Sequence, residues 1–323
     1  MIVDNKMVGV YVLCAGRTDY LEEMLSSLVK ANTRNFTITI SNNSSSKDVE
    51  IYLVKLANKY GVDYRENKPD YHGIFPHMDS IFKESKFEYT CVLHDDDIIH
   101  QNYFDICVSL IENNRHALAV ACNANLILGK NPISKKFAVS TNGLDVSLSK
   151  PLDLLERMFD FSSSLPPFPA WIYKTSAVRD LSQSAYAGRN YGDVMLLATL
   201  LKSGTLIFSD SVGMGYRRHD KSMSAHTSIL SRNEFLSKVC TDTEFQVPPG
   251  FLASALFHSR LYMCKDYIIQ FGLYRFMSRY MPVVKWTIGR TFNEIAMNPE
   301  KALLVVRKIV LVFRHKFLST FKK

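Results

Sequence analysis

The chain has 323 residues, enough for one large domain or two smaller ones of about 100–200 residues each. Hydrophobic residues make up 47% of it and charged residues 22%, which excludes a disordered chain, a collagen-like repeat and a polytopic membrane protein. The 39 Lys and Arg residues outnumber the 31 Asp and Glu residues, giving a formal net charge of +8. A basic protein can bind nucleic acid, an anionic membrane surface or phosphate-bearing substrates.

The excess positive charge is concentrated at the C-terminal end. Residues 251–323 contain thirteen basic and three acidic residues, a net charge of +10, which leaves −2 for residues 1–250. The near-neutral body argues against nucleic acid as a partner. Residues 301–323 combine Leu, Val and Phe with cations at helical spacing. This pattern predicts contact with an anionic membrane surface; the alternative is a helix packed on the core or on a second subunit.

The six cysteines and the N-terminal residues indicate the cellular compartment in which the protein works. No two cysteines form a CxxC pair, and four of the six lie in apolar runs, as buried thiols do in a reducing compartment. We find neither a secretory signal pattern nor an uninterrupted apolar run of about 18 residues. We therefore expect a cytoplasmic protein, peripheral at the inner face of the cell membrane.

Apolar runs of strand length alternate with helical patterns along the first 122 residues. We expect strands at 8–14, 36–41, 62–65, 89–93 and 117–122, and helices at 18–30, 47–60, 76–85 and 102–114. Thr18 is the expected N-cap of the first helix. This alternation predicts an α/β fold with a mostly parallel sheet flanked by helices.

The second half is less regular. We expect a loop-rich region at 124–187 with one helix (152–159) and one strand (171–174), then a helix at 193–202 and strands at 205–208 and 212–217. The pattern after residue 226 is helical. The predicted organisation is a catalytic domain at 1–226 and a basic helical extension at 227–323.

The run His94-Asp95-Asp96-Asp97 directly follows a predicted buried strand. Three adjacent carboxylates repel one another, so the run needs solvent or a cation. Ligand sites of open parallel sheets lie at the carboxyl ends of strands, and carboxylate oxygens suit Mg²⁺ or Mn²⁺. The two interpretations are a divalent metal site and a solvated acidic turn.

Two further segments carry charged side chains that could do chemistry. Asp193 opens the helix at 193–202, where it could be an N-cap or a general base. Arg217, Arg218 and His219 end the last predicted strand. They could gather diphosphate oxygens and supply a metal ligand, or form a solvated strand end.

In this order the segments resemble the family 2 inverting glycosyltransferases, which have the GT-A fold. The resemblance covers residues 8–226. It rests on Arg17 after the first strand, Ser41-Asn42-Asn43-Ser44 after the second, the Asp run, Gly192-Asp193 on a later helix, and Tyr216-Arg217-Arg218-His219. It implies a nucleoside diphosphate sugar as donor and Mg²⁺ or Mn²⁺ as cofactor.

The resemblance also implies roles for single residues. Asp95 would contact the ribose or sugar of the donor, and Asp96 and Asp97 would bind the divalent ion on its diphosphate. His219 would complete the metal ligands. Asp193 would deprotonate the acceptor hydroxyl for in-line attack on the anomeric carbon.

Other positions depart from the family pattern but remain donor-binding candidates. The family has Pro-Thr-Tyr-Asn-Arg after the first strand, and this chain has Leu13-Cys14-Ala15-Gly16-Arg17, which keeps only the arginine. Ser41, with Asn42 beside it, stands where the family has an Asp that contacts uracil. Met78 stands where the family has an arginine near the phosphates, with His77 beside it as the candidate replacement, and Arg65 falls in a region of nucleotide contacts.

The resulting expectation is a metal-dependent glycosyltransferase that moves a single sugar to a lipid-linked or surface-polysaccharide acceptor with inversion. The Gln-x-x-Arg-Trp motif of processive relatives is absent from the sequence, which indicates addition of one sugar. The alternative is a catalytically silent glycan- or partner-binding protein on the same fold.

Overall fold

The computed structural model describes residues 7–67, 73–136, 138, 143–159, 165–181, 191–219, 229–242, 245, 247–248, 251 and 255. The chain divides into two compact units, Met1–Val247 and Pro248–Lys323. The predicted membrane-contacting segment, 301–323, lies outside the described residues. No helix within the described part of the chain is long and apolar enough to cross a membrane.

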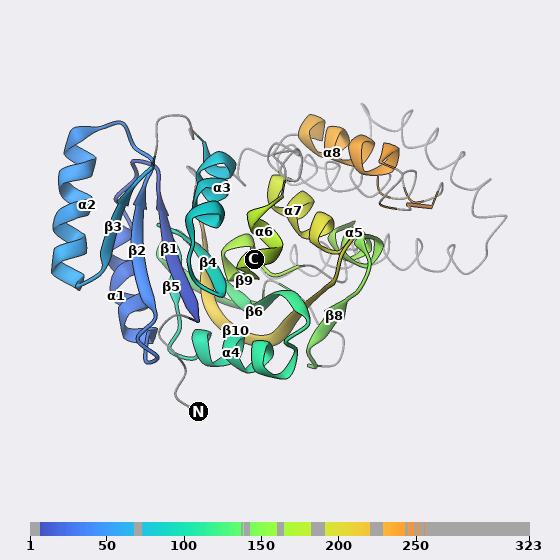
Figure 1. The fold of residues 1–323 in the computed structure, drawn as a ribbon, viewed down its shortest axis with the longest axis horizontal. Helices are drawn as coiled ribbons and strands as arrows, with labels where there is room; N and C mark the ends of the chain where they lie inside the picture. Colours follow the sequence, from blue (N-terminus) through green and yellow to red (C-terminus); the bar gives the residue numbers. More distant parts are fainter. Residues whose placement is uncertain are drawn as a thin grey trace, which may run out of the picture. The chain divides into compact units, whose positions relative to one another are not determined.

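A ten-stranded mixed sheet forms the centre of the first unit (Figure 1). Its strand order is β3-β2-β1-β4-β9-β6-β10-β5, with β7 paired to β6 and β8 paired to β10. Strands β3, β2, β1 and β4 are parallel to one another, while β9 is antiparallel to both of its neighbours. The strands are β1 Val8–Cys14, β2 Thr37–Asn42, β3 Asp63–Glu66, β4 Tyr89–His94, β5 Ile98–Ile99, β6 Ala117–Leu128, β7 Asn131–Lys136, β8 Val146–Leu148, β9 Trp171–Lys174 and β10 Thr205–Arg218.

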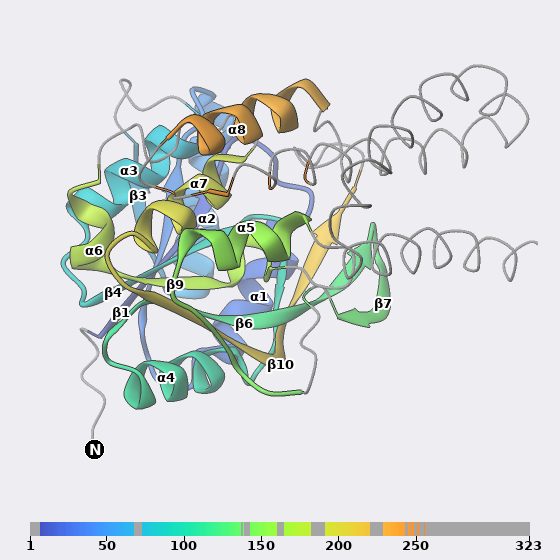
Figure 2. The same ribbon diagram turned by 90° about the vertical axis from the view of Figure 1, so that its right-hand side faces the viewer.

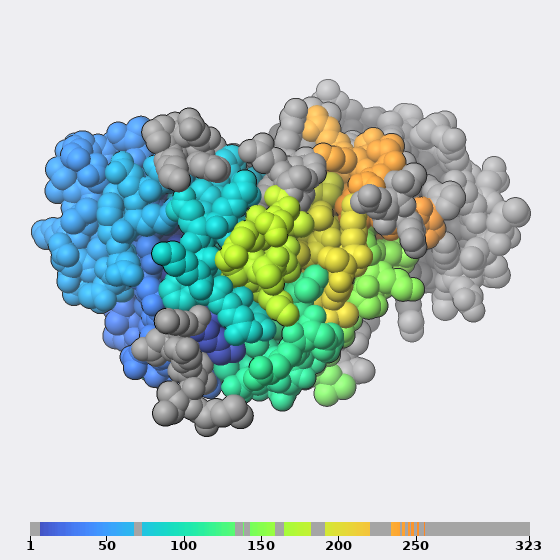
Figure 3. All heavy atoms as spheres, viewed as in Figure 1, coloured from blue at the N-terminus to red at the C-terminus, as the bar shows by residue number. Residues whose placement is uncertain are grey.

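Helices cover the sheet, with α4 on one side and α5, α6 and α7 on the other (Figure 2). Figure 3 shows α3 beside α6 on one face of the molecule. The described helices are α1 Leu21–Ala31, α2 Lys47–Tyr60, α3 Ile74–Glu84, α4 Tyr103–Asn113, α5 Pro151–Phe159, the 3₁₀ helix η1 Phe168–Ala170, α6 Thr175–Arg179, α7 Gly192–Leu200 and α8 Ile229–Thr241. The mixed α/β fold with a mostly parallel half-sheet confirms the predicted fold class.

The hydrophobic pattern explains both strand β1 and helix α1. All seven residues of β1 are buried because the strand is central in the sheet and covered on both faces. In α1, Leu21, Met24, Leu25 and Leu28 follow the helical period and are fully buried. Helix α1 begins later than predicted: its N-cap is Tyr20, and Thr18 contributes only a backbone carbonyl to the Leu21 N–H, at 3.3 Å.

The largest differences from the predicted elements lie in the second half. Strand β10 is continuous from residue 205 to 218, and its pairing with β6 shifts register around Phe208–Val212, where polar residues had suggested a break. Strand β6 runs six residues further than predicted, to Leu128. The predicted loop-rich region also contains β7, β8, η1 and α6. These short elements pair with or pack on longer ones, so their own sequences carry little periodic signal.

Two glycines let β10 lie close to its neighbours. A Cβ atom at Gly213 would lie 2.7 Å from the Cys122 Sγ and 3.2 Å from the Tyr103 Cα, and one at Gly215 would lie 2.5 Å from the Ile127 side chain. Of the six cysteines, the four with described side chains, Cys14, Cys91, Cys107 and Cys122, are buried and free.

Replacing Gly213 by Ala should therefore destabilise the protein. We expect Gly213→Ala to lower the free energy of unfolding by about 1–3 kcal/mol, because the added methyl group overpacks the contact between β10, Cys122 and α4. Thermal or urea unfolding measures the change, with Ser211→Ala, at an exposed position of the same strand, as the control. Adding Cys122→Ala should restore part of the loss. A Gly213→Ala protein as stable as the wild type would contradict this packing.

Candidate active site

The register of the parallel strands brings polar side chains to one edge of the sheet. Leu13 of β1 is paired with Ser41 of β2 on one side and with His94 of β4 on the other. Ser41 is in turn paired with Arg65 of β3. From β1 the chain passes to β2 and β3 on one side and then returns to β4 on the other side of β1. The carboxyl ends of β1 and β4 therefore lie at a topological switch point of the sheet. Ligands of open α/β sheets bind at such edges.

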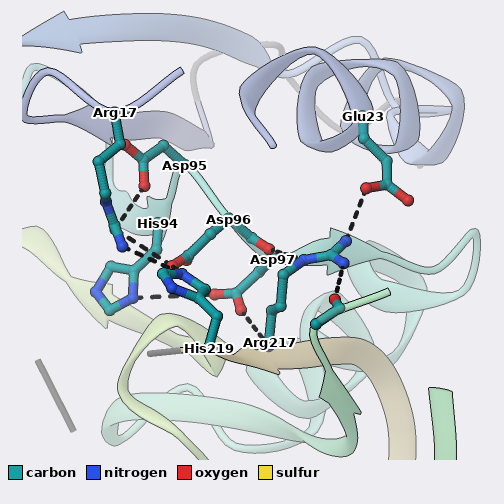
Figure 4. A network of polar contacts seen from close by, with 9 residues as sticks. Arg17, Glu23, His94, Asp95, Asp96, Asp97, Arg217 and His219 are labelled. Carbon is teal, nitrogen blue, oxygen red and sulfur yellow. Dashed lines mark hydrogen bonds and ion pairs between the residues drawn. The ribbon is translucent and has the colours of Figure 1, made fainter. Parts of the chain in front are cut away.

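The Asp run after β4 is buried and paired with Arg17 from the loop after β1 (Figure 4). The Arg17 Nη2 lies 3.0 Å from the Asp95 Oδ1 and 3.2 Å from the Asp96 Oδ2. Asp95 and Asp96 are only 4% and 7% exposed. Burial raises the pKa of Asp95 to about 7, against the opposing effect of Arg17. This burial overturns the alternative of a solvated acidic turn.

His219, just after β10, joins the same cluster. Its Nε2 lies 2.9 Å from the Asp96 Oδ2 and 3.2 Å from the Arg17 Nη1. A guanidinium only donates hydrogen bonds and a carboxylate only accepts them, so one ring nitrogen faces groups with opposite requirements. A cation between Asp96 and His219 would accept a lone pair from each, and the Arg17 Nη1 would then donate to another acceptor.

Asp97 and His94 form the inner part of the cluster. Asp97 is fully buried, and its Oδ1 accepts the Arg217 backbone N–H at 2.9 Å. Within the described part of the chain, the Asp97 Oδ2 and the His94 Nε2 are buried without a hydrogen-bond partner. Burial raises the pKa of Asp97 well above its ordinary value and lowers that of His94.

A possible set of metal ligands follows from these positions. One ligand atom each from His94, Asp96 and Asp97 lies within 4.8 Å of the others. His94 was quoted with the Asp run in the sequence but was not predicted as a ligand. The signal that could have identified it is its place as the last residue of a buried strand, paired with Leu13 at the functional edge.

The burial of Arg217 contradicts the alternative of a solvated strand end. Its side chain is 2% exposed, and its guanidinium lies over the Tyr20 ring, 4.3 Å from the centroid. The Nε donates to the Asp96 carbonyl oxygen at 2.6 Å, the Nη2 to the Glu23 Oε2 at 2.8 Å, and the Nη1 to the Gly129 carbonyl oxygen. These groups hold the guanidinium, and its bond to the Asp96 carbonyl oxygen ties Arg217 to the backbone of the Asp run.

A second polar cluster lies at the ends of β2 and β3. The Ser41 Oγ lies 2.7 Å from the His77 Nε2 and accepts a hydrogen bond from the Arg65 Nη1 at 2.9 Å. Arg65 also contacts the Ser80 Oγ and Glu84 through its Nη2, at 2.9 Å each. Burial, reinforced by the Arg65 charge, lowers the pKa of His77 to about 4, so His77 is neutral at pH 7. The structure thus brings together three predicted donor-binding residues.

Asn42 supports the loop that follows β2. Its Nδ2 donates to the Tyr64 hydroxyl at 3.1 Å, and its Oδ1 accepts the Ser44 backbone N–H at 2.9 Å. Its backbone carbonyl accepts the Asn67 N–H at 2.8 Å. The Asn42 side chain is therefore buried in a turn beside the Ser41 cluster.

Asp193 lies in the first turn of α7, whose N-cap is Tyr191, so the N-cap alternative for Asp193 is wrong. The Asp193 Oδ1 accepts the Val194 backbone N–H at 2.9 Å, and burial raises the Asp193 pKa to about 6. A Cβ atom at Gly192 would lie 2.5 Å from the Phe75 ring, so α7 begins in close contact with α3. No hydrogen bond or ion pair among the described side chains joins Asp193 to the Asp run.

Comparisons with known proteins agree with this arrangement. The family model for glycosyl transferase family 2 matches residues 10–181, just over half of the chain. A search of curated proteins gives no match. Similar solved structures include S. aureus TarS 1–349 in complex with UDP-GlcNAc, with a TM-score of 0.55 and 12% identity over 81% of this chain and 75% of that one. Another is GalNAc-T7 with UDP, GalNAc and Mn²⁺, with a TM-score of 0.55 and 12% identity over 85% and 58% of the two chains.

The sheet order and the Asp run at its switch point, together with these likenesses, define a protein with the GT-A fold. The chain belongs to glycosyl transferase family 2. Both the predicted fold and the resemblance noted in the sequence are thereby confirmed.

The contacts of Arg217 give a test at this site. Arg217→Lys keeps the charge, but its single ammonium nitrogen cannot reach the three separate acceptors that the Arg217 Nε, Nη1 and Nη2 contact. We therefore expect a loss of about 1.5–3 kcal/mol in unfolding free energy. Calorimetry measures the loss, with Arg218→Lys at the exposed neighbouring position as the control. An Arg217→Lys protein as stable as the wild type would contradict a stabilising role for these three contacts.

Proposed function

We propose that the chain is a metal-dependent, inverting glycosyltransferase that moves a single sugar from a nucleoside diphosphate sugar to a lipid-linked or surface-polysaccharide acceptor. The observation that carries the proposal is the convergence of Arg17, Asp96 and His219, from three separate segments, at the switch point of the sheet. Family membership supports it, as do the UDP-GlcNAc bound in TarS and the UDP and Mn²⁺ bound in GalNAc-T7.

The residues present fit a divalent cation. Asp96, Asp97 and His219 would hold it, because the Asp97 Oδ2 has no hydrogen-bond partner among the described residues and His219 faces the Asp96 carboxylate. When bound, Mg²⁺ or Mn²⁺ would neutralise negative charge on the diphosphate leaving group. Arg17 supplies further positive charge beside this place, and its partly exposed side chain can reach a phosphate oxygen.

The remaining candidate residues would contact two different parts of the donor at the carboxyl edge of the sheet. Asp95, next to the metal ligands, would contact the ribose or the sugar. Ser41, Asn42, Arg65 and His77 would contact the nucleoside, because their cluster lies at the carboxyl ends of β2 and β3, beside the Asp run. Arg217 would act indirectly, through the Asp96 backbone.

Asp193 would act as the general base. Inversion by a single displacement needs one group that removes the acceptor hydroxyl proton while the diphosphate leaves. A carboxyl group with a pKa of about 6 is mainly ionised at pH 7 and is a stronger base than an ordinary aspartate. Transfer of one sugar agrees with the absence of the Gln-x-x-Arg-Trp motif from the sequence.

One observation favours a second candidate, a catalytically silent glycan- or partner-binding protein on the same fold. Ser41, at the predicted nucleoside subsite, is already bonded to His77 and Arg65 within the protein. A silent relative would show no metal-dependent stabilisation by nucleoside diphosphates in a thermal-shift screen, whereas the enzyme would.

The base assignment predicts a pH profile. The Asp193 pKa is raised, so the carboxylate is protonated and inactive below about pH 6, and kcat should fall as the pH falls through that value. Asp193→Asn should abolish transfer. It should also stabilise the fold at pH 8 by about 1–3 kcal/mol, since the native ionised carboxylate is unfavourable at any pH above its folded-state pKa.

Transfer rates across pH and thermal unfolding at pH 8 measure these two effects. Asp105→Asn, an aspartate in the first turn of α4 that pairs with Arg34, is the matched control and should retain activity. An active Asp193→Asn enzyme would contradict the base assignment.

The C-terminal segment predicts where the enzyme works. Removal of residues 301–323 should reduce flotation with vesicles that contain anionic lipid, because seven Lys and Arg residues and an apolar face are lost. Vesicles of neutral phosphatidylcholine are the control and should bind the full chain weakly. Equal flotation of the full and shortened chains with anionic vesicles would contradict membrane contact through this segment.

A further inference from the structure

We propose that the His94 imidazole is a ligand of the metal ion and gives the site a preference for Mn²⁺ over Mg²⁺. This inference rests on the proposed function for the presence of a metal at the Asp run. It adds a ligand that the sequence did not indicate and a chemical reason for the choice of ion.

The first support is distance. One ligand atom each from His94, Asp96 and Asp97 lies within 4.8 Å of the other two. Oxygen and nitrogen ligands lie about 2.0–2.2 Å from such an ion, so two ligands on opposite sides are separated by about 4–4.4 Å. The three side chains therefore need only small shifts to share one ion.

The second support is the state of the buried polar atoms. The Asp97 side chain is fully buried, and its Oδ2 has no hydrogen-bond partner in the described part of the chain. Buried polar atoms normally have partners, so unpartnered ones in a polar cluster indicate a missing ligand. The Asp97 Oδ2 and the His94 Nδ1 lie 3.9 Å apart, too far for a hydrogen bond between them.

The third support is charge. Arg17 pairs with Asp95 and Asp96, but no Lys or Arg among the described residues forms an ion pair with the Asp97 carboxylate. The guanidinium of Arg217 is directed to Glu23 and to carbonyl oxygens, and only its backbone N–H reaches Asp97. A buried carboxylate without a counterion requires either a proton or a cation.

The orientation of His94 is already fixed. Its ring stacks on Phe168 of η1, with centroids 5.7 Å apart and an angle of 29° between the planes. A ring held in this way can bind an ion without losing rotamer freedom. Phe168 therefore positions the ligand that we propose.

Ligand chemistry then favours one ion over the other. Mg²⁺ is typically bound through carboxylates, phosphates and water, whereas imidazole nitrogen is a ligand of first-row transition ions. His94 and His219 would give the site two such nitrogens beside two carboxylates. Mn²⁺ accepts both kinds of ligand, and Mg²⁺ gains little from the nitrogens.

The test compares Mn²⁺ and Mg²⁺ affinities of the full chain by electron paramagnetic resonance and competition titration, with and without uridine diphosphate. His94→Phe is the decisive variant, because it keeps the ring that stacks on Phe168 and removes both nitrogens. We expect this variant to lose about ten- to a hundredfold in Mn²⁺ affinity, with little change for Mg²⁺. His116→Phe, at an exposed turn, is the matched control. Nitrogen couplings in the spin-echo spectrum of bound Mn²⁺ should weaken in His94→Phe alone.

The outcomes separate this inference from the proposed function. If Asp96→Asn loses Mn²⁺ binding, the metal site is in place. If folded His94→Phe then keeps the wild-type ratio of Mn²⁺ affinity to Mg²⁺ affinity, the proposed role of His94 is wrong. Absence of Mn²⁺ binding by the wild type, with and without uridine diphosphate, would overturn both. A His94→Phe protein that fails to fold is replaced by His94→Gln, for which the same loss is expected.

Discussion

The structure depends on keeping three consecutive carboxylates buried at the end of β4. Unpaired buried charge is strongly unfavourable, so Asp95, Asp96 and Asp97 require compensation from elsewhere in the chain. Arg17 provides it from the loop after β1, while the Arg217 backbone and His219 provide it from the end of β10. The same contacts therefore join the ends of β1, β4 and β10 and assemble the candidate site. A cation at this place would serve both stability and chemistry.

The first half of the fold could be predicted from the sequence because its elements are long and regular. Mostly apolar runs predict central parallel strands such as β1 and β4, and the predicted helix at 47–60 agrees with α2 at both ends. The second half could not be predicted in the same way. The polar residues near 209–211 suggested a break, but glycines at 213 and 215 allow β10 to continue past a register shift. Short strands such as β8 depend on pairing with β10 and show no period of their own.

The site was predictable where residues follow the carboxyl ends of strands, because parallel strands place those residues at one edge. Arg17, the Asp run and His219 meet for this reason. The orientation of each side chain could not be predicted. Arg217 and Arg218 are adjacent, yet side chains alternate along β10, so one is buried under Tyr20 and the other is exposed. The role that we propose for His94 likewise depends on the position of its Nδ1, 3.9 Å from the Asp97 Oδ2, and on its stacking on Phe168, neither of which the sequence shows.

The central claim is that the Asp run handles a nucleoside diphosphate sugar through a divalent ion. The most direct measurement is release of nucleoside diphosphate from a panel of sugar nucleotides, with Mn²⁺ and with chelator, by the wild type and by Asp96→Asn. We expect metal-dependent release from at least one donor by the wild type, and none above background by the folded variant. Equal release by both proteins, or no release and no metal-dependent binding of any donor, would contradict it.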